Sequence, residues 1–275
     1  MLCVVSVIQA IILGIVQGLS EFLPISSSGH LVIVPELFGI PVPSLAFDVL
    51  LHLATVAAAV VYFYRDIGRI ILSFVAPRKL SFDEVKRYRR LTLWLVAGSI
   101  PVAVVGLALN NFVESLFNST LAVGIFLMLT SLIMAGAELT YAVTARRRAL
   151  GQMGLIDGVI VGLFQALAIA PGLSRSGATI SGGMYLGFER ETAARFAFLL
   201  GIPASLGAGL VKAKDLAQGF GGTEASAYVA GGLAALVVGF AAVYLLIRFL
   251  RGHRLVVFSV YTFILGAFVV VLSLA

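Results

Sequence analysis

The sequence has few charged residues and almost no cysteine. Only 12% of its 275 residues are Asp, Glu, Lys or Arg, and Cys3 is the single cysteine. One cysteine allows no internal disulfide, and Cys3 has no companions with the spacing of a metal site. Hydrophobic residues make up 60% of the chain, and the mean hydropathy is +1.08. These values exclude an ordinary soluble domain and indicate a protein that crosses a membrane several times.

Charge is also absent from the N-terminal segment, where no charged residue precedes Glu21. A secretory signal begins with a basic region, so we expect this segment to stay in the mature protein. The net charge of +6 comes from basic residues at the ends of apolar stretches. Such placement is typical of membrane topology and of contact with anionic headgroups, so we expect no nucleic acid partner.

Six apolar stretches are long enough to span a membrane, at about 44–64, 91–110, 120–142, 193–213, 227–248 and 255–275. Two further apolar regions, about 4–39 and 154–189, are interrupted by polar residues and by Pro24 and Pro171. Because proline ends helices, we expect each region to form two short helices in a re-entrant hairpin. The predicted fold class is all-α, with one integral membrane domain over residues 1–275.

The polar interruptions form a cassette that occurs twice. Five pairs of identical residues are separated by 148 positions: Gly14/Gly162, Gln17/Gln165, Ser26/Ser174, Ser28/Ser176 and Gly29/Gly177. We therefore expect two repeats, about 1–145 and 150–275, each with one hairpin and three spans. An odd number of spans predicts that the second repeat is inverted in the membrane. Interrupted apolar segments at corresponding places in two halves are typical of a buried binding site.

Basic residues predict the orientation. The loop from 65 to 90 has eight Lys or Arg and is expected in the cytoplasm, whereas the loop near 111–119 has none. In this orientation only Lys212 and Lys214 lie outside. Most other basic residues lie inside, namely Arg146–Arg148, Arg190, Arg195, Arg248, Arg251 and Arg254. Both termini are then outside, and the cassettes enter from opposite sides and meet near the midplane.

The first cassette combines a carboxylate with hydroxyl groups. Gln17 and Glu21 are four residues apart, so both side chains lie on one helix face. Ser26, Ser27 and Ser28 precede the next helix, where a hydroxyl caps free amides and the amide cluster favours an anion.

The second cassette repeats this arrangement and adds a guanidinium group. Ser174, Arg175, Ser176 and Thr179 supply hydroxyls and a planar fork that binds phosphate oxygens in a bidentate manner. Together the cassettes predict a phosphate site. Glu21 of the first cassette can hold a divalent cation or carry a proton, and a neighbouring imidazole can act as base, acid or nucleophile. That imidazole is His30.

Each residue also has a structural interpretation. Glu21 can be a structural charge paired with Arg175, because charges inside membranes usually pair. His30 can be a capping or interfacial imidazole. For Ser26 and Ser28, we favour roles in turns and caps over catalysis.

Polar and small residues within the spans are expected to serve packing. His52 and Asp48 lie on a span without cassette neighbours, so we expect them to pack or to line a pore. The span glycines are expected to be small-residue contacts between helices: Gly98, Gly106, Gly124, Gly136, Gly207, Gly209, Gly231 and Gly232.

At the cassettes the chain resembles the undecaprenyl-pyrophosphate phosphatases, the bacitracin-resistance family. The family signature (Glu/Gln)-x-x-x-Glu is matched by Gln17 and Glu21, followed by Phe-Leu-Pro-Ile-Ser-Ser-Ser-Gly-His up to His30. Its second signature, Pro-Gly-x-Ser-Arg-Ser-x-x-Thr, is matched from Pro171 to Thr179. Both motifs are long and ordered, and the similarity extends over almost the whole chain.

This resemblance implies a multi-pass enzyme of the plasma membrane that removes the terminal phosphate from a C55 polyprenyl diphosphate. The monophosphate carrier for cell-wall precursors is thereby recycled. The resemblance also implies an inverted repeat with six spans and two re-entrant hairpins, a divalent cation (Mg²⁺ or Ca²⁺), a homodimer and an active site open to the outside.

The resemblance also assigns roles to residues. Glu21 and Gln17 belong to the metal and acid/base group, and Ser27 and His30 are candidates for the nucleophile or its activator. Arg175 grips the diphosphate, with help from three hydroxyls: Ser174, Ser176 and Thr179. Gln17 is the less acidic of the two residues found at its position, so we expect weaker cation binding here.

Two classes of function are consistent with these patterns. In a hydrolase, the diphosphate enters from the outer leaflet and the prenyl chain lies in an apolar groove between helices. In a secondary transporter or lipid flippase, the same inverted repeats and broken helices serve alternating access. The combination of His30, Ser27 and Glu21 favours the hydrolase, because transport has little need of a reactive set.

Overall fold

Long apolar helices account for most of the protein. The computed structural model describes residues 5–41, 43–109, 116, 119–144, 147–212 and 225–274, and within these ranges it is helical, with no strand. Six of these helices are long and apolar enough to cross a membrane, namely α3 (Leu45–Tyr62), α5 (Phe82–Ala108), α7 (Thr120–Val143), α10 (Arg190–Val211), α12 (Ala225–Leu250) and α13 (Val256–Leu274). Each matches one predicted span, which confirms an all-α membrane protein.

Both interrupted regions form two shorter helices, as predicted. The first gives α1 (Val7–Phe22) and α2 (Ser27–Phe38), and the second gives α8 (Leu155–Leu167) and α9 (Arg175–Tyr185). Helix α1 ends just before Leu23, whose extended backbone is the conformation that a following proline imposes.

The basic loop from 65 to 90 is more helical than expected. It contains α4 (Tyr64–Val75), the short η1 (Pro77–Lys79) and the first turns of α5. A capping box between Ser81 and Glu84 starts α5 ahead of its apolar stretch. Helix α4 forms because Ile67 and Ile70, three residues apart, pack against the core while its charged face stays exposed. A second short turn, η2 (Leu150–Gln152), precedes α8.

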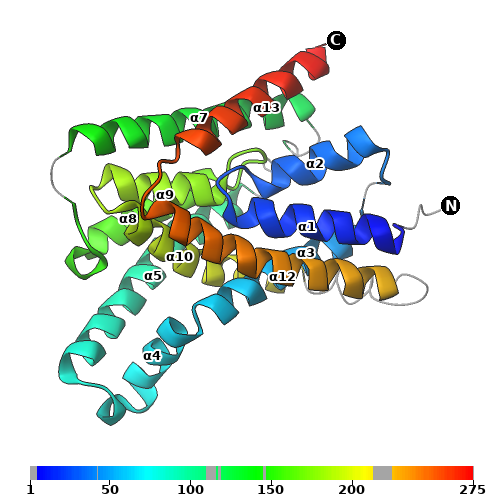
Figure 1. The fold of residues 1–275 in the computed structure, drawn as a ribbon. Helices are drawn as coiled ribbons and strands as arrows, with labels where there is room; N and C mark the ends of the chain where they lie inside the picture. Colours follow the sequence, from blue (N-terminus) through cyan, green and yellow to red (C-terminus); the bar gives the residue numbers. More distant parts are fainter. Residues whose placement is uncertain are drawn as a thin grey trace.

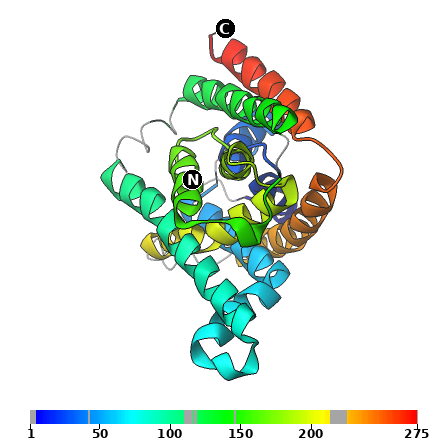
Figure 2. The same cartoon turned by 90° about the vertical axis from the view of Figure 1, so that its left-hand side faces the viewer.

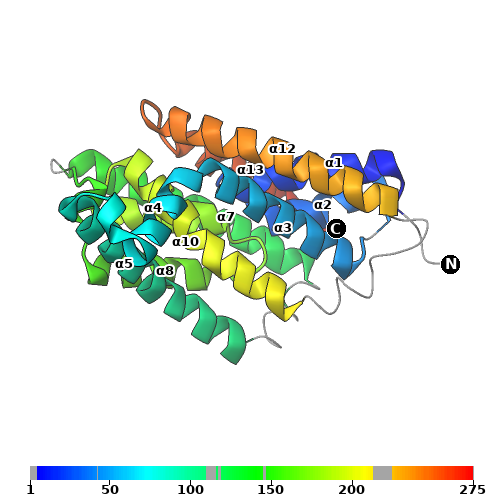
Figure 3. The ribbon, with the colours of Figure 1, turned by 90° about the horizontal axis from the view of Figure 1, so that it is seen from below.

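The helices pack in pairs, as Figure 1 shows. Helix α1 lies along α12, α8 lies along α5, and α7 lies along α13, while α3 contacts both α12 and α10. Figure 2 looks along the long helices and shows α2 and α9 near the middle. Helix α9 contacts α7 on one side and α10 on the other. From below, α3 and α10 lie next to each other (Figure 3). The two cassettes are therefore carried by helices inside the bundle.

Glycine allows several of these pairs to approach closely. A Cβ atom added to Gly14 would lie 2.3 Å from the carbonyl oxygen of Gly231, and one added to Gly162 would lie 2.1 Å from that of Gly98. Close contacts of this kind confirm the packing role predicted for five span glycines: Gly98, Gly124, Gly136, Gly209 and Gly231. The prediction is wrong for Gly207, where an added Cβ would meet no atom within 4 Å. At Gly106 and Gly232 the nearest atom is at 3.7 Å, an ordinary contact distance.

Ion pairs gather at the ends of the helices that carry the basic residues. Four arginines bind carboxylates there, in the pairs Arg148–Asp157, Arg190–Glu138, Arg195–Asp66 and Arg251–Glu191. These residues lie at the end of the bundle that also contains α4 and the start of α5, on the left in Figure 1. The predictions for Cys3, Arg146, Lys214 and the two terminal residues concern positions outside the described residues.

Candidate active site

The two cassette turns contact each other directly. The backbone N–H of Gly172 donates to Ser28 Oγ at 3.2 Å, and Ser176 Oγ donates to the carbonyl of Leu23 at 3.1 Å. The first bond joins the segment between α8 and α9 to the first turn of α2, and the second joins the first turn of α9 to the turn between α1 and α2. The predicted meeting of the cassettes is therefore confirmed.

Serine hydroxyls start both of the second helices. Ser26 Oγ accepts from the N–H of Gly29 at 3.3 Å, and Ser174 Oγ accepts from the N–H of Gly177 at 3.1 Å. The capping role expected for Ser26 is thereby confirmed. Each capping hydroxyl also contacts a second serine, Ser28 at 3.3 Å or Ser176 at 3.1 Å. The start of each helix thus presents hydroxyls and amides, the groups that favour an anion.

Ser26 has an unusual backbone conformation. Its φ is 72°, and no other non-glycine residue within the described ranges has a positive φ. Such a conformation costs about 1–3 kcal/mol and persists only where surrounding contacts hold it. Here the carbonyl of Ser26 accepts from the N–H of His30 at 3.2 Å and from His30 Nδ1 at 2.8 Å. His30 therefore helps to hold the turn in place.

Glu21 is the central charge of the site. It is 8% exposed and forms an ion pair with Arg175 through Oε1. Its other oxygen, Oε2, accepts from Ser27 Oγ at 2.7 Å and from Gln17 Nε2 at 3.0 Å. The structural pairing considered for Glu21 is thus observed, and the same carboxylate also contacts the candidate nucleophile.

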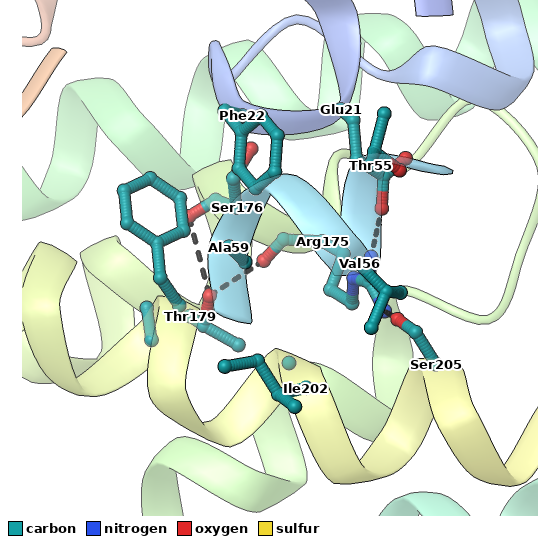
Figure 4. Close-up of a pocket in the computed structure, with 13 residues that line it drawn as sticks. Glu21, Phe22, Thr55, Val56, Ala59, Arg175, Ser176, Thr179, Ile202 and Ser205 are labelled. Atoms are coloured by element: carbon teal, nitrogen blue, oxygen red, sulfur yellow. Dashed lines mark hydrogen bonds and ion pairs between the residues drawn. The ribbon is translucent and has the colours of Figure 1, made fainter. Parts of the chain in front are cut away.

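Arg175 lies at the start of α9 and faces a pocket between α3, α9 and α10 (Figure 4). One guanidinium nitrogen donates to Glu21 and another donates to Ser205 Oγ on α10. Thr179 Oγ1 donates to the backbone carbonyl of Arg175 at 2.7 Å, so this hydroxyl supports the first turn of α9. Glu21, Arg175, Ser176 and Thr179 all line the pocket.

Both ring nitrogens of His30 have hydrogen-bond partners, one in the turn and one on α13. Since the Ser26 carbonyl can only accept, His30 Nδ1 carries the proton and Nε2 accepts from the hydroxyl of Tyr261 at 2.7 Å. The two rings are stacked, with centroids 5.7 Å apart. Neither His30 nor Ser27 is among the described residues that line the pocket. Ser27 is joined to the pocket through its hydrogen bond to Glu21, which also binds Arg175, whereas the ring nitrogens of His30 contact Ser26 and Tyr261.

Three polar residues of the site were not singled out from the sequence as members of it. Thr55 and Ser205 line the pocket, from α3 and α10. His52 Nε2 lies 3.8 Å from Glu21 Oε2, so the expectation that His52 has no cassette neighbour was wrong. The physical reason is that α3 passes directly beside the end of α1. The available signal was the presence of His52 and Thr55, three residues apart on one face of an apolar span.

Oxygen atoms near Glu21 fit a divalent cation in part. Gln17 Oε1 is buried and has no hydrogen-bond partner, which leaves it available as a ligand. Over the described ranges, however, no three His, Cys, Asp or Glu side chains form a metal cluster. Mg²⁺ is often bound by one or two carboxylates together with substrate phosphates. The residues thus fit a cation that the substrate helps to hold, rather than a complete site made by the protein alone.

Comparison with known proteins identifies the family. A family model described as bacitracin resistance protein BacA matches residues 10–268. An undecaprenyl-diphosphatase of Moorella thermoacetica is 44% identical over 266 residues, covering 96% of this chain and 97% of that protein. An undecaprenyl-diphosphatase of Methanosphaera stadtmanae is 40% identical over 284 residues, covering 97% and 98%. These matches confirm the resemblance found in the cassettes, and the chain belongs to the bacitracin resistance protein BacA family.

Proposed function

We propose that this protein hydrolyses undecaprenyl diphosphate to the monophosphate and inorganic phosphate, and so recycles the lipid carrier for cell-wall synthesis. The relatives that cover nearly the whole chain have the name undecaprenyl-diphosphatase. The observation that carries the proposal is the Glu21 carboxylate, which contacts both Ser27 Oγ and the Arg175 guanidinium beside two helix starts. A nucleophile, a base and an anion-binding group are thereby combined at one point.

Binding of the diphosphate uses the starts of α2 and α9. The hydroxyls and amides around Ser26, Ser28, Ser174 and Ser176 stabilise the negative charge of the diphosphate as hydrogen-bond donors. Arg175 binds phosphate oxygens through its planar fork. Little covalent chemistry is required of the protein in phosphoryl transfer, so positioning and charge stabilisation provide most of the rate. Thr179 supports this arrangement through the backbone of Arg175.

Ser27 is the proposed nucleophile. Its Oγ donates to Glu21 Oε2, so Glu21 can take the proton as Ser27 attacks the terminal phosphorus. The bond from phosphorus to the bridging oxygen breaks, and undecaprenyl phosphate leaves with the bridging oxygen. Glu21 gives the proton from Ser27 to the departing undecaprenyl phosphate and is a carboxylate again. Water then loses a proton to Glu21 as it attacks the phosphoserine, the bond from phosphorus to Ser27 Oγ breaks, and Glu21 returns this proton to Ser27 Oγ as inorganic phosphate leaves. The nitrogens of His30 are engaged by Ser26 and Tyr261, which supports a positioning role for His30 rather than nucleophilic attack.

A divalent cation, Mg²⁺ or Ca²⁺, is part of the proposal. Glu21 and Gln17 Oε1 would bind the cation together with the diphosphate oxygens. When bound, the cation neutralises part of the negative charge of the phosphates. With Gln17 in place of a second carboxylate, affinity for the free cation is expected to be low.

The proposed arrangement in the membrane is an inverted repeat with two re-entrant hairpins. The helix contacts support this arrangement. Between the two repeats, α1 corresponds to α8, α3 to α10, α5 to α12 and α7 to α13. The contact of α1 with α12 is therefore repeated as the contact of α8 with α5, and the contacts of α3 with α10 and of α7 with α13 each join two corresponding helices. The repeat limits, about 1–145 and 150–275, stay predictions. Basic residues at one end of the bundle support a plasma membrane orientation with that end inside and with both termini and the active site facing the outside. The family resemblance also supports a homodimer.

Hydrolysis in detergent tests this function. Purified protein is expected to release inorganic phosphate from undecaprenyl diphosphate, in a medium where transport has no meaning. Ser27→Ala should lower kcat at least about a thousandfold, since it removes the nucleophile. Ser99→Ala is a matched control, because the Ser99 hydroxyl only donates to the carbonyl of Leu95 within α5.

A labelled terminal phosphate locates the covalent intermediate. Label trapped on Ser27 is the expected result. Label on His30, or full turnover by Ser27→Ala, would refute the assignment of the nucleophile. If the wild-type protein releases no phosphate, hydrolysis itself is wrong and the transporter interpretation takes its place.

A further inference from the structure

The pocket beside Arg175 is lined by both polar and apolar groups. The polar lining contains the Glu21–Arg175 ion pair and the hydroxyls of Thr55, Ser176, Thr179 and Ser205. The apolar lining includes groups from α3, drawn in light blue in Figure 4, and from α10, drawn in yellow: Val56, Ala59, Phe198, Gly201 and Ile202. A substrate with an anionic headgroup and a long apolar chain needs both kinds of lining.

The space between α3 and α10 is closed at both of its ends. Toward the C-terminus of α10, a Cβ atom added to Gly209 would lie 2.6 Å from Leu53 Cδ2 on α3. Toward its N-terminus, the ring of Phe198 lies against the ring of Phe63, the residue that directly follows α3, with centroids 6.5 Å apart. An apolar chain that leaves a headgroup at Arg175 between α3 and α10 therefore passes between these two contacts.

Gly201 lies between the two closed ends and lines the pocket. A Cβ atom added there would meet no atom within 4 Å, so this part of the wall is open. On its outer side, α10 exposes Pro203 and Leu206, and Leu206 lies one turn after Ile202. A chain that passes Gly201 thus stays on apolar surface until it reaches the surrounding lipid.

We propose that the prenyl chain of the substrate leaves the site between α3 and α10 at Gly201, and that the missing side chain at this position admits it. This inference rests on the proposed function, because it requires a lipid diphosphate. It assigns to Gly201 a role in substrate selection: the first isoprenoid units cross the wall where the backbone alone leaves room for them.

A pair of glycine substitutions on one helix tests the passage. Gly201→Leu fills the opening and is expected to lower kcat/KM for undecaprenyl diphosphate by about tenfold or more, with Gly201→Ala between it and the wild type. Gly207→Leu is the matched control, since an added Cβ at Gly207 also meets no atom within 4 Å and Gly207 does not line the pocket. Equal activity of the two leucine variants would overturn the inference.

Cross-linking of the wild-type protein gives a second test that no folding defect can affect. The probe is a polyprenyl diphosphate with a diazirine on its first isoprenoid unit. Labelled peptides are expected to contain Val56, Gly201 or Ile202. Labels near Tyr261, the residue of α13 that contacts His30, would overturn the proposed passage even where phosphate release is normal. If phosphate release fails but these three residues are labelled, the passage stands and the hydrolase proposal falls.

Discussion

Replacing Arg175 by lysine keeps the positive charge and removes the planar fork. Two nitrogens of the guanidinium have separate partners, the Glu21 carboxylate and the Ser205 hydroxyl. These contacts show that the fork can bind two oxygen atoms at once, whereas an ammonium group is a compact point charge and cannot bind two phosphate oxygens in the same geometry. Loss of one hydrogen bond to a charged group costs about 1.5–3 kcal/mol. Because about 1.36 kcal/mol corresponds to a tenfold change in rate, kcat/KM is expected to fall roughly ten- to hundredfold.

The assay is steady-state release of phosphate from undecaprenyl diphosphate in detergent, with kcat and KM determined separately. Arg248→Lys is the matched control, because Arg248 contacts the hydroxyl of Tyr244 at 3.3 Å and lies near the end of α12, away from the pocket. This variant should stay within about twofold of the wild type. Near-normal turnover in Arg175→Lys would show that the fork is not needed, and the bidentate interpretation of Arg175 would be wrong.

Three further predictions follow from single contacts. Gln17→Glu adds a carboxylate beside Glu21, so half-maximal activation should need less Mg²⁺ or Ca²⁺, and an unchanged titration after chelator treatment would contradict the cation site. Tyr261→Phe removes one hydrogen bond to His30, so kcat should fall less than about tenfold, whereas a complete loss would indicate a catalytic role. Gly14→Leu places atoms against the carbonyl of Gly231 and should lower Tm, while Gly68→Leu, which has open space, should not.

The sequence predicted the spans well because the thickness of a membrane determines how long an apolar helix must be. All six predicted stretches coincide with long helices. The observed helices differ from the predicted spans where polar residues are part of a helix. A cap at Ser81 lengthens α5, and the amphipathic α4 was assigned to a loop because its charged face hides a helical pattern.

The contact between the cassettes was predictable because the repeat places two polar turns at equivalent positions. Glu21 and Arg175 are 154 residues apart in the chain, yet they form an ion pair as the repeat implies. The direction of His30 was not predictable. It depends on Tyr261, a residue of α13 that is 231 positions away and belongs to no motif.

His52 and Ser205 illustrate a different limit. His52 and Thr55 mark one polar face of α3, but the sequence does not show which helix that face will meet, and a lone polar residue such as Ser205 is typical of packing. Their place in the site depends on α3 and α10 passing beside the cassettes, which is a property of the packed bundle. Local patterns therefore predict the cassette residues, whereas residues contributed by the surrounding helices require the structure.

The contact between Glu21 and Arg175 also explains how the Glu21 carboxylate can be a paired buried charge without substrate and a proton acceptor with substrate. Without substrate, a buried charge must be paired, and Arg175 fulfils this requirement for Glu21. In the proposed mechanism the diphosphate competes with Glu21 for the same guanidinium, since phosphate oxygens match its fork equally well. As Arg175 turns to the phosphate, Glu21 loses its strongest partner while its bond from Ser27 remains. The carboxylate then becomes a better proton acceptor only when a substrate is present. The proposed mechanism thereby couples substrate binding to activation of Ser27 through one ion pair.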